Sequence, residues 1–105
     1  MIVAVAHNKG GVGKTTTVVQ LAGELKPEII IDLDAHQGIA IINGRRPAEQ
    51  RWDVRAGLNK AALIKLLKDA GERLVLIDCG GFDSELVRIA IAAADLIIAP
   101  SNDDI

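Results

Sequence analysis

One short stretch limits the fold of this chain more than any other, Lys9-Gly10-Gly11-Val12-Gly13-Lys14-Thr15-Thr16. It follows an apolar run at residues 2–6 and opens a helical pattern over residues 14–26, which ends before Pro27. Glycines let backbone N–H groups turn inward around phosphate oxygens without a side chain in the way. A strand, a glycine loop and a helix N-terminus in this order predict a phosphate-binding loop.

Two residues of this loop have distinct expected roles. Lys14 brings a positive charge to the β- and γ-phosphates of a nucleotide, and the Thr15 hydroxyl coordinates magnesium. The predicted cofactors are therefore ATP and Mg²⁺. The residues expected to bind them are Lys9, Gly10, Gly11, Val12, Gly13, Lys14, Thr15 and Thr16.

The rest of the chain predicts an α/β fold in one domain over residues 1–105. Four apolar runs lack strict alternation, as expected of strands buried on both faces of a parallel sheet; they cover residues 2–6, 28–33, 74–78 and 95–99. Helical patterns lie between them at residues 14–26, 60–70 and 84–94, with Asn59 and Asp83 as expected N-caps of the last two. Since Trp52 and Phe82 are the only aromatic residues, the core must be aliphatic.

Acidic residues follow two of the predicted strands. In open α/β sheets, ligands bind beyond the carboxyl ends of the strands, so Asp34 and Asp78 should converge on the glycine loop. Asp78 is the expected partner of Thr15 on the magnesium side. Asp34 is the candidate for orienting the attacking water, and we also include it in the metal site. Asp32 is expected to bond nearby backbone groups.

The loop departs from the general form G-x-x-x-x-G-K-[ST], because Asn8 stands where the first glycine belongs and Lys9 follows it. It resembles the deviant Walker A loop of the ParA/MinD family of P-loop ATPases. The stretches 76–81 and 93–100 also resemble that family, so the resemblance covers residues 1–42 and 73–101. It implies that Lys9 reaches the partner's nucleotide across a dimer interface, and that Asp34 acts on water.

Some positions depart from the family pattern. Ala35-His36-Gln37 stands where the family has Pro-Gln, and we interpret His36 as an exposed loop residue. Gly80-Gly81 replaces prolines, which favours a more flexible switch. Cys79 is expected to be a small buried residue and not a nucleophile. As a single cysteine it forms no internal disulfide, which is typical of a reducing cytoplasm.

The resemblance also implies a strand order and a length. P-loop ATPases of this division place the strand with the second Asp beside the P-loop strand, so we expect the order 2-3-1-4. Family members are much longer, which predicts a truncated sheet: the amino-terminal half of a ParA-type ATPase, or a reduced member. The strand at 96–99 would then be an open apolar edge that self-associates.

Residues 38–58 are the least regular part, and with Lys60 they carry five cations against Glu49 and Asp53. A solvated surface loop is the expected reading, with a DNA or partner contact as the alternative. The net charge of −2 provides no global attraction to nucleic acid or membrane. No apolar run is long enough to span a bilayer, so a cytoplasmic location is expected.

We therefore expect a ParA-like ATPase that binds and hydrolyses Mg-ATP as a dimerisation switch in plasmid or chromosome partitioning. Expected partners are a second copy and a centromere-binding protein, with non-specific DNA for a full-length form and no membrane. Three alternatives stay open: a nucleotide-binding module without turnover, a MinD-like positioning ATPase, and a metal-cluster carrier.

Overall fold

The computed structural model describes residues 1–6, 14–34, 37–80 and 84–99, without the side chains of residues 14–16. Five parallel strands form one sheet in the order β3-β2-β4-β1-β5. They are β1 (Ile2–Val5), β2 (Ile29–Asp32), β3 (Val54–Ala56), β4 (Val75–Asp78) and β5 (Leu96–Ile98). The expected order 2-3-1-4 is confirmed for the four predicted strands, which are β1, β2, β4 and β5.

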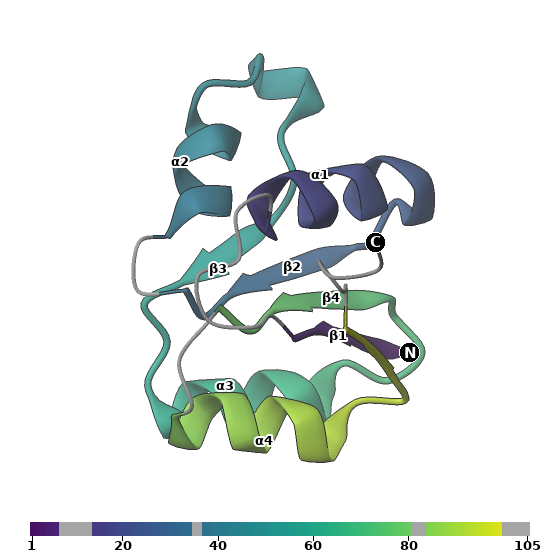
Figure 1. Cartoon of the computed structure of the whole chain (residues 1–105), viewed down its shortest axis with the longest axis vertical. Helices are drawn as coiled ribbons and strands as arrows, with labels where there is room; N and C mark the ends of the chain where they lie inside the picture. The colour runs from purple at the N-terminus through teal and green to yellow at the C-terminus, as the bar shows by residue number, and fades with distance from the viewer. Residues whose placement is uncertain (7–13, 35–36, 81–83, 100–105) are drawn as a thin grey trace, which may run out of the picture.

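Helices cover both faces of the sheet, as expected (Figure 1). The helices are α1 (Lys14–Leu25), α2 (Gly38–Gly44), α3 (Lys60–Asp69) and α4 (Glu85–Ala93). Figure 1 shows α1 and α2 on one face and α3 and α4 on the other. The chain is therefore a three-layer α/β structure, with the sheet in the middle.

The core has two halves because successive strand residues point to opposite faces. On the face of α1 and α2, Val3, Ile30 and Leu76 pack against Val18 and other helix residues. On the other face, the neighbouring strand positions pack against α3 and α4; they include Ala4, Ile31 and Ile77. All residues of β2 and β4 are buried, which explains why their sequences are apolar without alternation.

The ends of the helices follow local rules. The Asn59 side chain accepts the backbone N–H of Ala62 at 2.8 Å, so the predicted cap of α3 is confirmed. For α4, the predicted cap Asp83 was wrong. Ser84 is the N-cap, and its hydroxyl oxygen accepts the backbone N–H of Val87 at 3.2 Å. A hydroxyl at that position satisfies an N–H that the first turn cannot.

The expected irregular loop at residues 38–58 was wrong in part. This segment contains α2, a 3-10 turn (Ala48–Gln50) and β3. Strand β3 pairs in parallel with β2, so the sheet has a fifth strand outside the predicted four. The buried side chain of Ile39 fixes α2 against the sheet, since it packs with the core on the side of α1.

Candidate nucleotide site at the carboxyl ends of the strands

Three strands end at the same level of the sheet. Val5 of β1 and Asp32 of β2 are both register partners of Asp78, the last residue of β4. The chain leaves β1 towards residues 7–13 and re-enters the described part as α1, which begins at Lys14. The glycine stretch therefore connects to the same edge of the sheet as the two acids.

The glycine loop itself falls outside the described residues. This applies to Lys9, Gly10, Gly11, Val12 and Gly13, and the side chains of residues 14–16 are also outside. Their contacts with phosphate and magnesium therefore stay predictions. The strand before the loop and the helix after it are both present, as the motif requires.

Asp32 is a buried carboxylate that holds the backbone of the following segment. It is 2% exposed. Its Oδ1 accepts the N–H of Asp34 and its Oδ2 accepts the N–H of Ala40, each at 3.1 Å. The expectation that Asp32 bonds nearby backbone groups is confirmed.

Opposing effects act on the pKa of Asp32, and the net result is a raised pKa. Burial raises the pKa, and the two backbone N–H groups lower it in part. The neighbouring charges of Asp78 and Asp34 raise it further. Strand register and the position of Asp34 beside Gly80 place these three carboxyl groups at one end of the sheet.

Asp34 lies two residues further along and is only half-buried. Its carbonyl oxygen accepts the N–H of Gln37 at 3.0 Å. Together with Gln37 and Gly57 it lines a hollow of about 170 Å³ beside Asp32. Asp34 therefore lines a hollow at the end of the sheet, and both carboxylate oxygens of Asp32 accept backbone N–H groups.

Asp78 and Gly80 bring the ends of β2 and β4 together. The Asp78 carbonyl oxygen accepts the N–H of Leu33 at 2.9 Å, and its carboxylate accepts the N–H of Gly80 at 3.1 Å. Gly80 has φ +69°, and a Cβ there would lie 3.0 Å from the Cα of Asp34. Any other residue would push the two segments apart.

The flexibility expected from Gly80 stays a prediction. The sequence did not reveal that this residue also permits close packing of the two acid-bearing segments, because the contact depends on the positions of β2 and β4. Gly81 and His36 lie outside the described residues. Cys79 is buried, as expected, and burial raises the pKa of its thiol to about 12, so it is no thiolate at neutral pH.

The comparisons with known proteins agree with this geometry. Residues 1–59, more than half of the chain, match the family of AAA domains. The chain belongs to that family. The match covers β1, the glycine loop, α1, β2 and the segment with Asp34.

The AAA-family chain also resembles ParA-type relatives, which confirms the resemblance expected from its loop. It is 30% identical to "Protein ParA" of Rhizobium radiobacter, over 94% of this chain and 47% of the relative. It is 33% identical to "Maintenance of carboxysome distribution protein A" of Gloeobacter kilaueensis, over 95% and 48%. It is 30% identical to "Chromosome-partitioning ATPase Soj" of Thermus thermophilus, over 93% and 53%. The chain spans about half the length of these relatives.

Both candidate carboxylates fit the chemistry of magnesium. Mg²⁺ prefers hard oxygen ligands and takes one or two carboxylates together with water and phosphate oxygens. Asp34 and Asp78 offer two such groups at one end of the sheet. Within the described residues, no cluster of three or more His, Cys, Asp or Glu side chains forms a metal site by itself. Two protein carboxylates without a third ligand among the described residues agree with a magnesium site that a nucleotide completes.

None of the described helices is long and apolar enough to span a membrane.

Proposed function

We propose that this chain binds ATP with Mg²⁺ and hydrolyses it, and that ATP drives the pairing of two copies in the partitioning of a plasmid or chromosome. One observation carries the proposal. The acids at the ends of β2 and β4 lie at the edge of the sheet from which β1 leads into the glycine loop. This arrangement supports a nucleotide whose phosphates lie over the strand ends.

Different residues of the site bind the phosphates, bind magnesium and position the attacking water in this proposal. The loop N–H groups and Lys14 bind the phosphates, and the Thr15 hydroxyl binds magnesium, with Asp78 on the same side. Magnesium neutralises charge on the phosphates when bound. Asp34 orients the attacking water, because it is half-buried and lines the hollow at the end of the sheet. Gly80 keeps Asp34 close to the segment that follows Asp78.

Family resemblance supplies the rest of the proposal. Lys9 reaches the nucleotide of the second copy, so ATP bridges two chains in the cytoplasm. A centromere-binding protein is the proposed partner that links this switch to its cargo. DNA binding belongs to a full-length form in this proposal.

The test separates binding from turnover. Lys14→Ala should abolish ATP binding, because glycine N–H groups alone cannot neutralise a triphosphate. Asp34→Ala should keep binding but slow hydrolysis by about 10²-fold or more, since water positioning acts on the transition state. Calorimetric titration measures the first effect and single-turnover phosphate release the second.

Control variants and contrary outcomes complete this test. Lys65→Ala on the exposed face of α3 should change neither quantity. Unchanged ATP affinity in Lys14→Ala would refute the loop assignment. Wild-type protein that binds ATP without releasing phosphate would instead be a binding module without turnover.

The pairing of two copies has its own prediction. Lys9→Ala should leave ATP binding by one chain nearly intact and weaken ATP-dependent pairing, because its charge is proposed to act across the interface. Sedimentation velocity with a non-hydrolysable ATP analogue measures the change. A variant that pairs as well as wild type would remove Lys9 from the interface.

A further inference from the structure

The segment between α2 and β3, residues 43–52, is a loop braced by its own side chains. The Asn43 amide donates to the Trp52 carbonyl at 2.9 Å and accepts the Trp52 N–H at 2.8 Å. Arg51 donates from Nε to the Arg46 carbonyl and from Nη2 to the Gly44 carbonyl, both at 3.0 Å. Such a loop, packed by its own side chains with its ends close together, has a fixed shape. We refer to residues 43–52 as the arginine loop.

Arg46 is held in the same way. Its Nε donates to the Gln50 carbonyl at 2.9 Å, and its guanidinium carbon lies 4.1 Å from the centre of the Trp52 ring. A guanidinium has five N–H donors, so these contacts leave donors for a ligand. Arg46 and Arg51 are therefore cations in fixed positions and would lose little freedom when they bind an anion.

The arginine loop, α1 and the two residues that follow α1 line an open hollow of about 640 Å³. Its apolar wall is formed by Val19, Ala22, Pro27 and Trp52. In Figure 1 the loop stands beside α1, on the face of the sheet opposite α3 and α4. The volume is that of a site for a small molecule or a short peptide.

The charge of this hollow is unbalanced. Its lining has three cations, Lys26, Arg46 and Arg51, and one carboxylate, Glu49. In the part of the chain that the structure describes, none of the three cations forms an ion pair. An anionic ligand would therefore meet a lining with a net positive charge among the described residues.

We propose that this hollow binds an acidic segment of a partner protein, in which carboxylates flank an apolar side chain. Carboxylates pair with the arginines, as in other arginine clusters that recognise acidic motifs, and the apolar side chain lies on the Trp52 wall. The proposal is independent of the nucleotide site, because the hollow lies at the last turns of α1 and the glycine loop precedes its first turn.

A nucleic acid fits this hollow less well. A phosphate backbone gains affinity from many cations along an extended surface. Here three cations line one concave site together with an apolar wall. The apolar wall would also have no role in contacts with phosphates.

Trp52 provides a direct readout, because the chain has one tryptophan and no tyrosine. The probe is a capped peptide that alternates glutamate and leucine, and the control peptide has glutamine in place of glutamate. We expect a saturable change in tryptophan emission with the acidic peptide, weaker at high salt. The glutamine peptide should produce no saturable change.

Three variants test the assignment to this hollow. Lys26→Asn should weaken binding about two- to fivefold, the range of an exposed ion pair, and Glu49→Gln should tighten it about as much. Asparagine suits position 26, because Lys26 has φ +51°. Arg45→Gln is the matched control, since Arg45 is exposed and does not line the hollow. Circular dichroism confirms that each variant is folded.

Several results would overturn the proposal. One is the absence of a saturable change with the acidic peptide at low salt. Another is affinity that is equal for wild type, Lys26→Asn and Glu49→Gln. A duplex oligonucleotide that changes the emission at lower concentration than the peptide, and displaces it, would assign the hollow to nucleic acid.

Discussion

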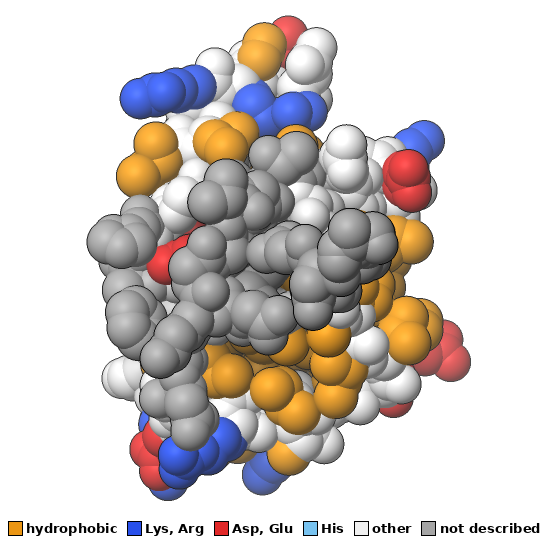
Figure 2. All heavy atoms as spheres, viewed as in Figure 1, with side chains coloured by type: hydrophobic (Ala, Val, Ile, Leu, Met, Phe, Trp, Pro, Cys, Tyr) orange, Lys and Arg blue, Asp and Glu red, His pale blue; other side chains and the backbone are white. Residues whose placement is uncertain are grey.

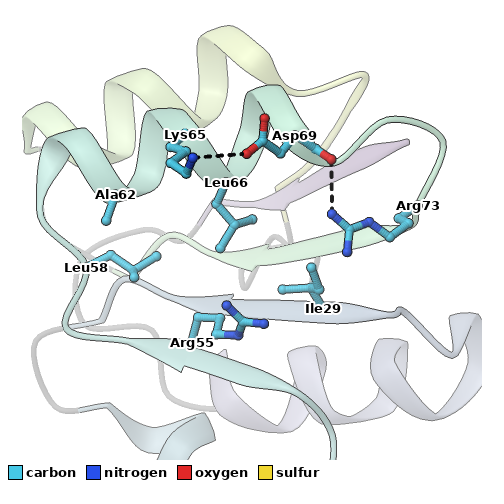
Figure 3. A pocket seen from close by; sticks show the side chains of 8 residues that line it. All are labelled: Ile29, Arg55, Leu58, Ala62, Lys65, Leu66, Asp69 and Arg73. Carbon is cyan, nitrogen blue, oxygen red and sulfur yellow. Dashed lines mark hydrogen bonds and ion pairs between the residues drawn. The ribbon is translucent and has the colours of Figure 1, made fainter.

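The two outer strands of the sheet, β3 and β5, protect their edges very differently. Strand β3 has three residues, and its exposed middle residue, Arg55, bonds twice to Asp53 at 2.7 and 3.0 Å. Figure 3 shows Arg55 from β3 facing the hollow under α3, among Ile29, Leu58 and Leu66. Strand β5 instead presents Leu96 and Ile97, which are 45% and 47% exposed.

This difference indicates which edge strand resists pairing with a strand of another chain. A charge on an edge strand discourages pairing, because pairing would bury it. Strand β5 has no such charge, and among the described strands only β1 pairs with it. Figure 2 shows apolar side chains gathered on the molecule over β5 and α4. We therefore expect the 105-residue chain to self-associate through β5 without nucleotide.

The first prediction tests this expectation at Ile97. Ile97→Lys should weaken self-association about a hundredfold or more, because pairing would bury an unpaired ammonium group at a cost of several kcal/mol. Sedimentation velocity over a range of protein concentrations measures it. The matched control is Ile41→Lys on α2, where the side chain is 53% exposed and far from β5 in sequence. A wild-type chain that stays monomeric at high concentration would refute the open edge.

Position 97 is a better target than position 98. Ile98 packs against the core on the face of α1, so a lysine there would also destabilise the fold. Ile97 faces the other side, in register with Ala4. A change at Ile97 therefore alters the edge and leaves the core nearly intact.

The same comparison shows what the sequence can predict. Four of the strands lie in apolar runs of the sequence. Their order was predicted correctly because the glycine loop and the acids indicate the family, and the family implies the order. Strand β3 was missed because three residues around a charged Arg55 form no apolar run. Tertiary pairing with β2, and not local composition, makes this segment a strand.

Helix α2 was missed for a related reason. It begins and ends with glycine, and its N-cap Gln37 has φ +51° and forms no side-chain cap. The missing local cap is replaced by Asp32, which accepts the N–H of Ala40 from the end of β2. In the candidate site, the acids were predictable from strand ends, but the contact of Gly80 with Asp34 depends on neighbouring strands.

The second prediction concerns a substitution that would make the β3 edge as apolar as the β5 edge. Arg55→Leu should remove the charge from β3 and create a second apolar edge. Partial burial of the new side chain at a contact contributes about 1.5 kcal/mol, so association should rise about tenfold. The clearest background is Ile97→Lys, in which the β5 edge is blocked. Arg45→Leu, an exposed site outside any strand, is the control, and an equal rise in that variant would contradict an edge effect.

The last prediction concerns the smallest effect, the acid dependence of the β3 edge. The hydrogen bond from Arg55, reinforced by its charge, lowers the pKa of Asp53 below the ordinary value of 3.8 despite some desolvation. A lowered pKa in the folded state stabilises the protein above pH 3.8, and this contribution is lost as the pH falls through the folded-state pKa. Both side chains are about half exposed, with 47% and 48% accessible, so solvent screening limits the contribution to about 0.5 kcal/mol. Urea unfolding of wild type and Asp53→Asn should therefore give free energies that differ by this amount near neutral pH and converge as the pH falls through the folded-state pKa. The same comparison in an Arg55→Leu background should give a smaller difference near neutral pH, because the partner charge is gone. A difference between wild type and Asp53→Asn that does not change with pH would show that the bond of Asp53 to Arg55 does not stabilise the folded edge.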